Sequence, residues 1–204
     1  MILFRSLLYI GFVIAVLVGW YFNGRKQSYT DSTSTDLETP LDTSEAIDIA
    51  LKQPHWKTRL LAVEQLRNGD SPQALPHLIA MLDDPVFDVR QAAAQGIIHY
   101  ADEAIPHLAD VLEMGRLNAR EMAIKTLCAI GTDATVDVLA KALQNDESAW
   151  VRIPAAEGLG AIGGEKALFA LLNALDDEHP DVVKTVESAL HHNMPIRGQN
   201  PNNL

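Results

Sequence analysis

The chain has 204 residues, of which 48% are hydrophobic, so it is long enough for one packed domain and its composition excludes wholesale disorder. Residues 1–26 hold three of the 16 Lys and Arg residues and none of the 27 Asp and Glu residues, which leaves 13 against 27 and a net charge of −14 on residues 27–204. Such a surface repels nucleic-acid phosphates and anionic lipid headgroups, and it favours a protein partner with a basic patch.

An uncharged run from Ser6 to Phe22 dominates the N-terminus. As a helix it would rise about 26 Å, close to the thickness of a bilayer core, so residues 1–26 are predicted to form a transmembrane signal-anchor with its flanks. Cleavage of a signal peptide is the alternative, but the best site, before Trp20, is poor. The positive charges on the two sides of the run nearly balance, so they do not set its orientation in the membrane. The short segment before the run favours export of the residues that follow it. We expect a single-pass protein of the bacterial inner membrane with its main domain outside the cytoplasm.

Residues 27–43 are rich in Ser, Thr and Asp and are predicted to be a disordered linker. A helical pattern follows over residues 44–192, and residues 193–204 are predicted to be a disordered tail of Asn, Pro and Gly. Membrane attachment is therefore expected only through the N-terminal helix.

Within residues 44–192 the same pattern returns about every thirty residues. Five basic residues, called the arginine ladder here, recur at gaps of 31, 30, 32 and 32 residues: Arg59, Arg90, Arg120, Arg152 and Lys184. Each Arg is followed by an alanine three positions later and a large aliphatic residue seven positions later. A fixed period of this length is typical of stacked helical repeats.

Second helices with one apolar stripe each complete the repeats. Helix pairs are predicted at about 54–84, 85–115, 116–147 and 148–179, with one isolated helix from Ser44 and a last helix at 181–192. No segment alternates with a period of two, so no strand is predicted. The expected fold is an all-α solenoid of about four and a half repeats, preceded by one transmembrane helix.

Two segments, Asp84–Ile97 and Trp150–Gly163, resemble the HEAT-repeat motif in its short bacterial form, the phycobiliprotein-lyase HEAT-like repeat, and Met122–Gly131 matches it again. The resemblance covers about residues 44–192 and implies a right-handed solenoid whose second helices line the concave face. Deoxyhypusine hydroxylase, a HEAT-repeat enzyme, has His-Glu pairs around a di-iron centre. The chain has no His-Glu dipeptide and only the reversed Glu178-His179, so it lacks the pairs that surround the di-iron centre of that enzyme.

Several motifs have simple structural explanations. The ladder arginines are expected to pair with acidic residues of the preceding turn between repeats, such as Asp84. The sequence Gly158-Leu-Gly160-Ala-Ile-Gly163 matches the GxGxxG pattern of dinucleotide-binding proteins. No strand is predicted before it, so we do not expect a nucleotide site there. The lone Cys128 excludes a disulfide framework and is expected to be packed rather than nucleophilic.

We expect no catalytic residues, no metal site and no cofactor, although a metal-binding or pH-sensitive contact between His77 and His107 is left open.

A candidate protein-binding surface follows from the apolar stripes, because the residues between them must point away from the core. Its members are His77, Met81, His107, Asp110, Val138, Lys141 and Asn173. We expect a non-catalytic, membrane-tethered scaffold or assembly factor that holds a protein partner, with no evident small-molecule substrate. The alternative, which rests on the resemblance, is an accessory subunit of a chromophore or cofactor lyase.

Overall fold

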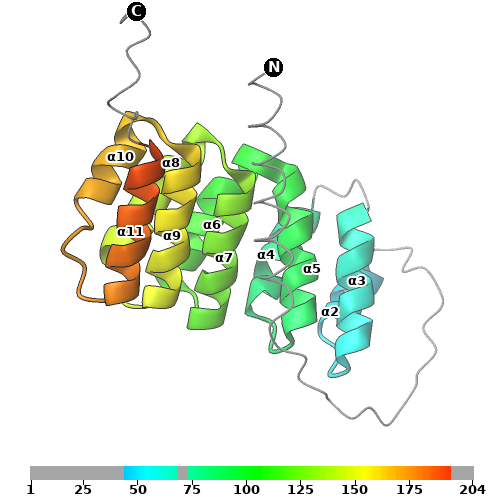
Figure 1. Cartoon of the computed structure of the whole chain (residues 1–204). Coiled ribbons are helices and arrows are strands. Elements are labelled where there is room, and N and C mark those ends of the chain that lie inside the picture. Colours follow the sequence, from blue (N-terminus) through cyan, green and yellow to red (C-terminus); the bar gives the residue numbers. More distant parts are fainter. Residues whose placement is uncertain (1–43, 69–72, 194–204) are drawn as a thin grey trace, which may run out of the picture. The chain divides into compact units, whose positions relative to one another are not determined.

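The computed structural model describes residues 44–68 and 73–193 (Figure 1). The predicted transmembrane segment, the linker and the tail beyond residue 193 lie outside these residues. Within them, no helix has the length and apolar character needed to cross a bilayer.

The α-helices are α2 (Ser44–Leu51), α3 (Trp56–Asn68), α4 (Ala74–Ala80), α5 (Phe87–Ile97), α6 (Ile105–Met114), α7 (Leu117–Ile130), α8 (Val136–Asn145), α9 (Ala149–Ile162), α10 (Gly164–Leu172) and α11 (Pro180–Asn193). Three 3₁₀ segments, η1 (Met81–Asp83), η2 (Ile98–Ala104) and η3 (Asp133–Thr135), continue or precede the even-numbered helices.

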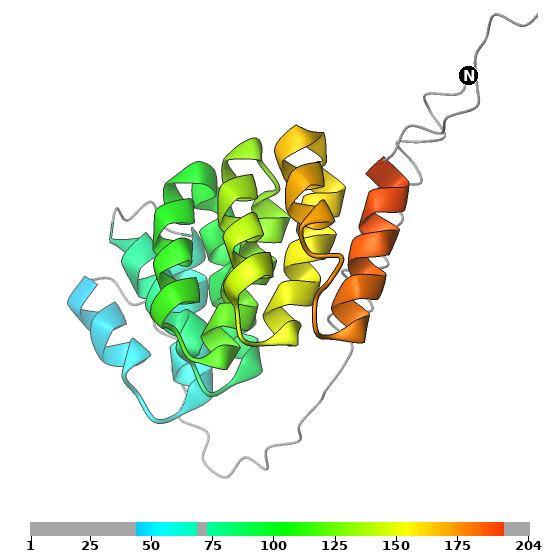
Figure 2. The same cartoon turned by 90° about the vertical axis from the view of Figure 1, so that its left-hand side faces the viewer.

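The described helices form two layers. The odd-numbered helices α3, α5, α7, α9 and α11 pack side by side, and the even-numbered helices cover the grooves between them (Figure 1). Figure 2 shows the pairs stacked in chain order from α2 to α11. The prediction of an all-helical repeat solenoid is confirmed, and no strand occurs among the described residues.

Small residues set the spacing of the odd-numbered layer. The alanine three positions after each ladder arginine is fully buried in every repeat: Ala62, Ala93, Ala123 and Ala155. The large residue four positions further, such as Ile97 or Leu127, is also buried. A methyl side chain at the first position lets neighbouring helices approach closely, and the larger one fills the space beneath.

The predicted apolar stripes of the second helices face the core, with exceptions near the ends of helices. Leu78, Leu108, Leu139 and Leu171 are fully buried. Leu175 lies four positions after the buried Leu171, so its spacing fits the stripe, but it is exposed because α10 already ends at Leu172.

The turns within the repeats require positive φ angles. Gly131 has φ 61° at the end of α7, and Gly163 has φ 72° at the end of α9. In the second pair Ala101 takes this role with φ 44°, the only such non-glycine residue in the described part of the chain. A Cβ atom disfavours this conformation, so the turn stores strain at Ala101.

Candidate functional site

The arginine ladder joins successive repeats through buried ion pairs. Arg152 Nε donates to Asp177 Oδ2 at 2.8 Å, and its Nη2 donates to Asp177 Oδ1 at 2.9 Å. Its Nη1 donates to the carbonyl oxygens of Asp146 and Glu147, at 2.8 and 3.1 Å. The planar guanidinium of Arg152 therefore joins the turn before α9 to the turn after α10.

Two other boundaries repeat this geometry. Arg59 holds Asp84 at 2.6 and 3.0 Å, and Arg120 holds Asp146 at 3.0 and 3.3 Å. The carboxylate thus comes from the turn that follows each arginine, 25 or 26 residues later, whereas the preceding turn supplies carbonyl oxygens. This corrects the expectation that the carboxylate comes from the preceding turn, since the returning even-numbered helix brings the later turn alongside.

Arg90 and Lys184 depart from the pattern. Arg90 Nη1 donates to the carbonyls of Asp84 and Pro85, at 2.6 and 3.1 Å, but no carboxylate within the described residues pairs with it. Its buried Nε has no hydrogen-bond partner there. Lys184 is exposed on α11 and makes no ion pair in the described ranges.

The predicted protein-binding residues lie on or beside the even-numbered helices, but they differ in exposure. His107, Asp110, Lys141 and Asn173 are exposed, whereas His77, Met81 and Val138 are half-buried. Met81 and Val138 also pack against the core. The exposed members form the part of this set that a partner could reach directly.

Some of these residues also link neighbouring even-numbered helices. His77 Nε2 contacts Asp48 of α2, its Nδ1 lies 2.9 Å from the Gln73 carbonyl, and Lys141 pairs with Glu113 of α6. Both ring nitrogens of His77 are thus occupied, which leaves none for a metal. In the described residues no group of three or more His, Cys, Asp or Glu side chains could hold a metal ion.

An exposed apolar cluster on α10 and the turn after it escaped the sequence-based selection. Its members Phe169, Leu172 and Leu175 are 65%, 43% and 37% exposed. The signal was present, because Phe169 and Leu172 are three positions apart and lie off the buried stripe that includes Leu171. They extend the exposed surface of the even-numbered helices toward the last repeat.

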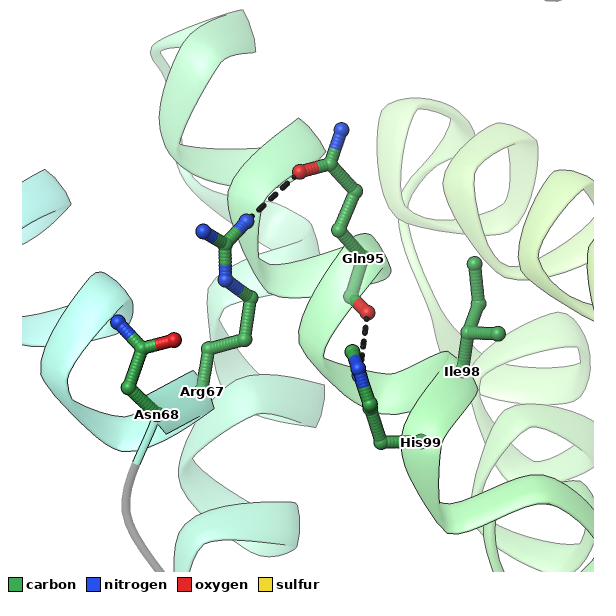
Figure 3. Close-up of a pocket in the computed structure, with 5 residues that line it drawn as sticks. All are labelled: Arg67, Asn68, Gln95, Ile98 and His99. Atoms are coloured by element: carbon green, nitrogen blue, oxygen red, sulfur yellow. Dashed lines mark hydrogen bonds between the residues drawn. The ribbon is translucent and has the colours of Figure 1, made fainter.

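A recess of about 450 Å³ lies where α3 ends and α5 continues into η2 (Figure 3). Arg67 Nη1 donates to Gln95 Oε1 at 2.8 Å, and His99 Nδ1 lies 3.1 Å from the Gln95 carbonyl oxygen. Because the polar groups bond one another, they do not converge on a common point where a ligand could sit.

Cys128 is packed between α7 and α9. Burial, with a smaller effect of Glu157, raises the pKa of its thiol to about 12. Its Sγ lies 3.2 Å from the carbonyl oxygen of Pro154, which accepts from it. The thiol is therefore protonated at neutral pH and unsuited to nucleophilic attack.

The glycines of the GxGxxG sequence serve helix packing and helix termination. A Cβ at Gly158 would lie 2.5 Å from Cys128 Sγ, and one at Gly160 would lie 2.6 Å from the Cβ of Ala189 on α11. Gly163 ends α9 with its positive φ. Since two of the glycines lie inside a helix, they form no phosphate-binding loop.

Two curated proteins are similar to the chain, and both are named phycocyanobilin lyase subunit beta. The protein from Thermosynechococcus vestitus is 35% identical over 101 residues, which is 50% of this chain and 47% of the relative. The protein from Nostoc sp. is 31% identical over 108 residues, which is 53% of this chain and 54% of the relative. The chain thus spans about half the length of the curated relatives it matches.

Solved structures with some likeness include the complex of CpcE and CpcF of phycocyanin lyase from Nostoc sp., at 22% identity and a TM-score of 0.49 over 80% of this chain and 70% of that one. Human deoxyhypusine hydroxylase has 22% identity and a TM-score of 0.47, with 72% of each chain covered.

The curated relatives correct the functional expectation. The expectation that the chain is not an enzyme is wrong, because both curated relatives are subunits of a lyase. The membrane-tethered scaffold finds no support in these comparisons.

The repeats themselves have a family assignment. A family model described as HEAT repeats matches residues 43–116 and 115–191, which is most of the chain. These matches contain the arginine ladder and both helix layers, and the chain belongs to the HEAT-repeat family.

Proposed function

We propose that the chain is an accessory subunit of a bilin lyase of the phycocyanobilin-lyase type. The observation that carries this proposal is the similarity to two lyase beta subunits, at 35% and 31% identity over about half of the chain. The substrate class is a bilin, and the macromolecular partner is a second lyase subunit or the protein that receives the bilin.

The repeat surface supports a role in holding a protein. The even-numbered helices present exposed His107, Asp110, Lys141 and Asn173, and the apolar cluster around Phe169 continues this surface on α10. Aromatic and aliphatic anchors among polar groups are typical of protein interfaces.

The negative charge of the chain indicates which kind of partner it would bind. Residues 27–204 have a net charge of −14, obtained from 13 basic and 27 acidic residues. A partner with a basic patch would be attracted over distances of about one Debye length, and added salt would slow its association. The half-buried His77, Met81 and Val138 would contribute at the edge of the contact.

Absorption spectroscopy tests the proposal. Phycocyanobilin is mixed with the full-length chain, with and without apo-phycocyanin, and the visible spectrum is followed. We expect a shifted and sharpened bilin band, and retention of apo-phycocyanin by the chain in a pull-down. An unchanged spectrum together with no retention of apo-phycocyanin would reject the proposal.

Matched variants locate the contact. Asp110→Lys combined with His107→Ala should weaken partner binding by roughly tenfold, because two exposed contacts on α6 change. Glu187→Lys reverses the same charge on the odd-numbered helix α11, where the side chain is also exposed, and should have little effect. Equal losses in both variants would place the contact elsewhere.

A further inference from the structure

Three adjacent odd-numbered helices begin with a large apolar residue that the fold leaves exposed. Phe87 is the first residue of α5, Leu117 is the first of α7, and Trp150 is the second of α9. Their exposed fractions are 37%, 40% and 70%. Met114, which ends α6 three positions before Leu117, is 82% exposed. Phe87, Leu117 and Trp150 are called the apolar row here.

The turns between repeats bring the apolar row to one edge of the molecule. These turns gather at one end of the stacked helices (Figure 2). Arg116, just before α7, lies 3.6 Å from Asp83, just before α5. Arg120 at the start of α7 pairs with Asp146, which precedes α9, at 3.0 Å. The starts of α5, α7 and α9 are therefore neighbours along this edge.

The spacing of the apolar row matches an α-helix better than a β-strand. Packed helices lie about 8–10 Å apart, so the row repeats at about that distance. A partner helix along the edge would present a side chain to it every seven residues, or about 10.5 Å. A strand presents one every two residues, or about 6.7 Å. Three contacts at the helical spacing need an amphipathic helix of about 15 residues.

Carboxylates surround the Trp150 end of the apolar row. Glu147 lies 2.8 Å from Arg120, and Glu178 lies 3.5 Å from Arg152. Each of these guanidiniums also holds a buried Asp, so two carboxylates share one positive charge. The side chains of Glu147 and Glu178 are 84% and 85% exposed. A net negative charge therefore remains on both sides of α9, where a cation can reach it from solvent.

The indole ring of Trp150 is also open to a cation. Lys57 Nζ lies 5.8 Å from the centre of the Trp56 ring, and the Arg90 guanidinium carbon lies 5.6 Å from that of Phe87. No cation within the described residues covers the Trp150 ring in this way. Because the face of an indole attracts cations, the exposed ring favours contact with a Lys or Arg side chain of another molecule.

We propose that the apolar row, together with Glu147 and Glu178, binds a basic amphipathic helix of a protein partner. The apolar stripe of that helix contacts the row, and its Lys or Arg side chains lie over Trp150 and pair with the two glutamates. A second copy of the chain is a poor occupant, because residues 27–204 have a net charge of −14. This edge is separate from the exposed surface of the even-numbered helices and does not depend on the proposed lyase function.

Nitrogen NMR of the tryptophan side chains tests the proposal. The full-length chain is labelled with ¹⁵N-tryptophan and titrated with a peptide of about 15 Leu and Lys residues, with Leu at helical spacing. The indole signal that is missing from Trp150→Ala should shift, and the signal that is missing from Trp56→Phe should stay. A peptide of the same composition with alternating Leu and Lys should bind roughly tenfold more weakly, and so should a Leu and Glu peptide with helical spacing.

Variants of the edge measure its contribution through the fluorescence anisotropy of the labelled Leu and Lys peptide. Trp150→Ala should weaken binding by roughly tenfold, because it removes the largest exposed ring of the row. Glu147→Gln with Glu178→Gln should weaken binding by roughly fivefold, and added salt should reduce this difference. Glu103→Gln with Glu165→Gln is the matched control and should have little effect, because both residues are exposed near the other end of the odd-numbered helices.

Three results would overturn the proposal. They are an unmoved Trp150 signal, equally tight binding by Trp150→Ala, and equal binding of the alternating peptide. A dimer in sedimentation experiments that Trp150→Ala dissociates would identify a second copy as the occupant and would also overturn it. Since no bilin and no lyase component is present, failure of this test is distinct from failure of the proposed function.

Discussion

Arg152 and Asp177 are 25 residues apart in the chain and form two parallel hydrogen bonds of 2.8 and 2.9 Å. Both side chains are at most 10% exposed. Removal of one partner from such a buried pair leaves an uncompensated charge. Successive repeats are therefore joined at a few positions, and substitution of one of these residues should strongly lower the free energy of unfolding.

Arg152→Ala should lower the free energy of unfolding by about 3 kcal/mol, because it leaves the Asp177 carboxylate buried and unpaired. Arg90→Ala should cost less, roughly 1 kcal/mol, since it removes only bonds to carbonyl oxygens. Urea denaturation followed by circular dichroism measures both variants. A larger loss for Arg90→Ala would contradict the structural role of the Arg–Asp pairs.

Acid should weaken the same pair. Burial alone would raise the pKa of Asp177, but hydrogen bonds from Arg152 and the His179 amide outweigh it and hold the pKa below its usual value. A depressed folded pKa gives stability that is present above the unfolded pKa, about 3.9, and is lost as pH falls through the folded value. The stability difference between the wild type and Asp177→Asn should therefore shrink below about pH 4. Parallel stability curves between pH 6 and pH 3 would contradict this assignment.

Ala101→Gly should raise the free energy of unfolding by about 1 kcal/mol, because glycine adopts the positive φ of this turn without strain. Ala129→Gly, at an exposed position in α7, is the control and should lower it by roughly 0.5–1 kcal/mol. Thermal unfolding compares the two. A loss of stability at both positions would show that Ala101 is not strained.

Gly158→Ala should lower the free energy of unfolding by about 1–3 kcal/mol, because its Cβ would lie 2.5 Å from Cys128 Sγ. In a Cys128→Ala background the same change should cost less, since the sulfur is gone. A double-mutant cycle measures this coupling. If the cost of Gly158→Ala is the same in both backgrounds, the close contact does not limit helix packing.

The sequence predicted the repeat period and both helix layers, because side-chain volume and spacing are local properties. It did not predict that Arg152 pairs with the later turn, since this depends on how α10 returns the chain. The strain at Ala101 carried no signal, because no glycine marks that turn. The spacing placed Phe169 off the buried stripe, but its exposure depends on whether another element covers that side of α10, which the sequence does not show.

Chromophore attachment is the most direct measure of the central claim. Apo-phycocyanin and phycocyanobilin are incubated with the candidate second lyase subunit, with and without the chain, and bilin that remains attached after denaturation is quantified. The account predicts attachment that requires the chain, falls by roughly tenfold with Asp110→Lys and His107→Ala together, and stays near the wild-type level with Glu187→Lys. Equal attachment with and without the chain would contradict a role in the lyase.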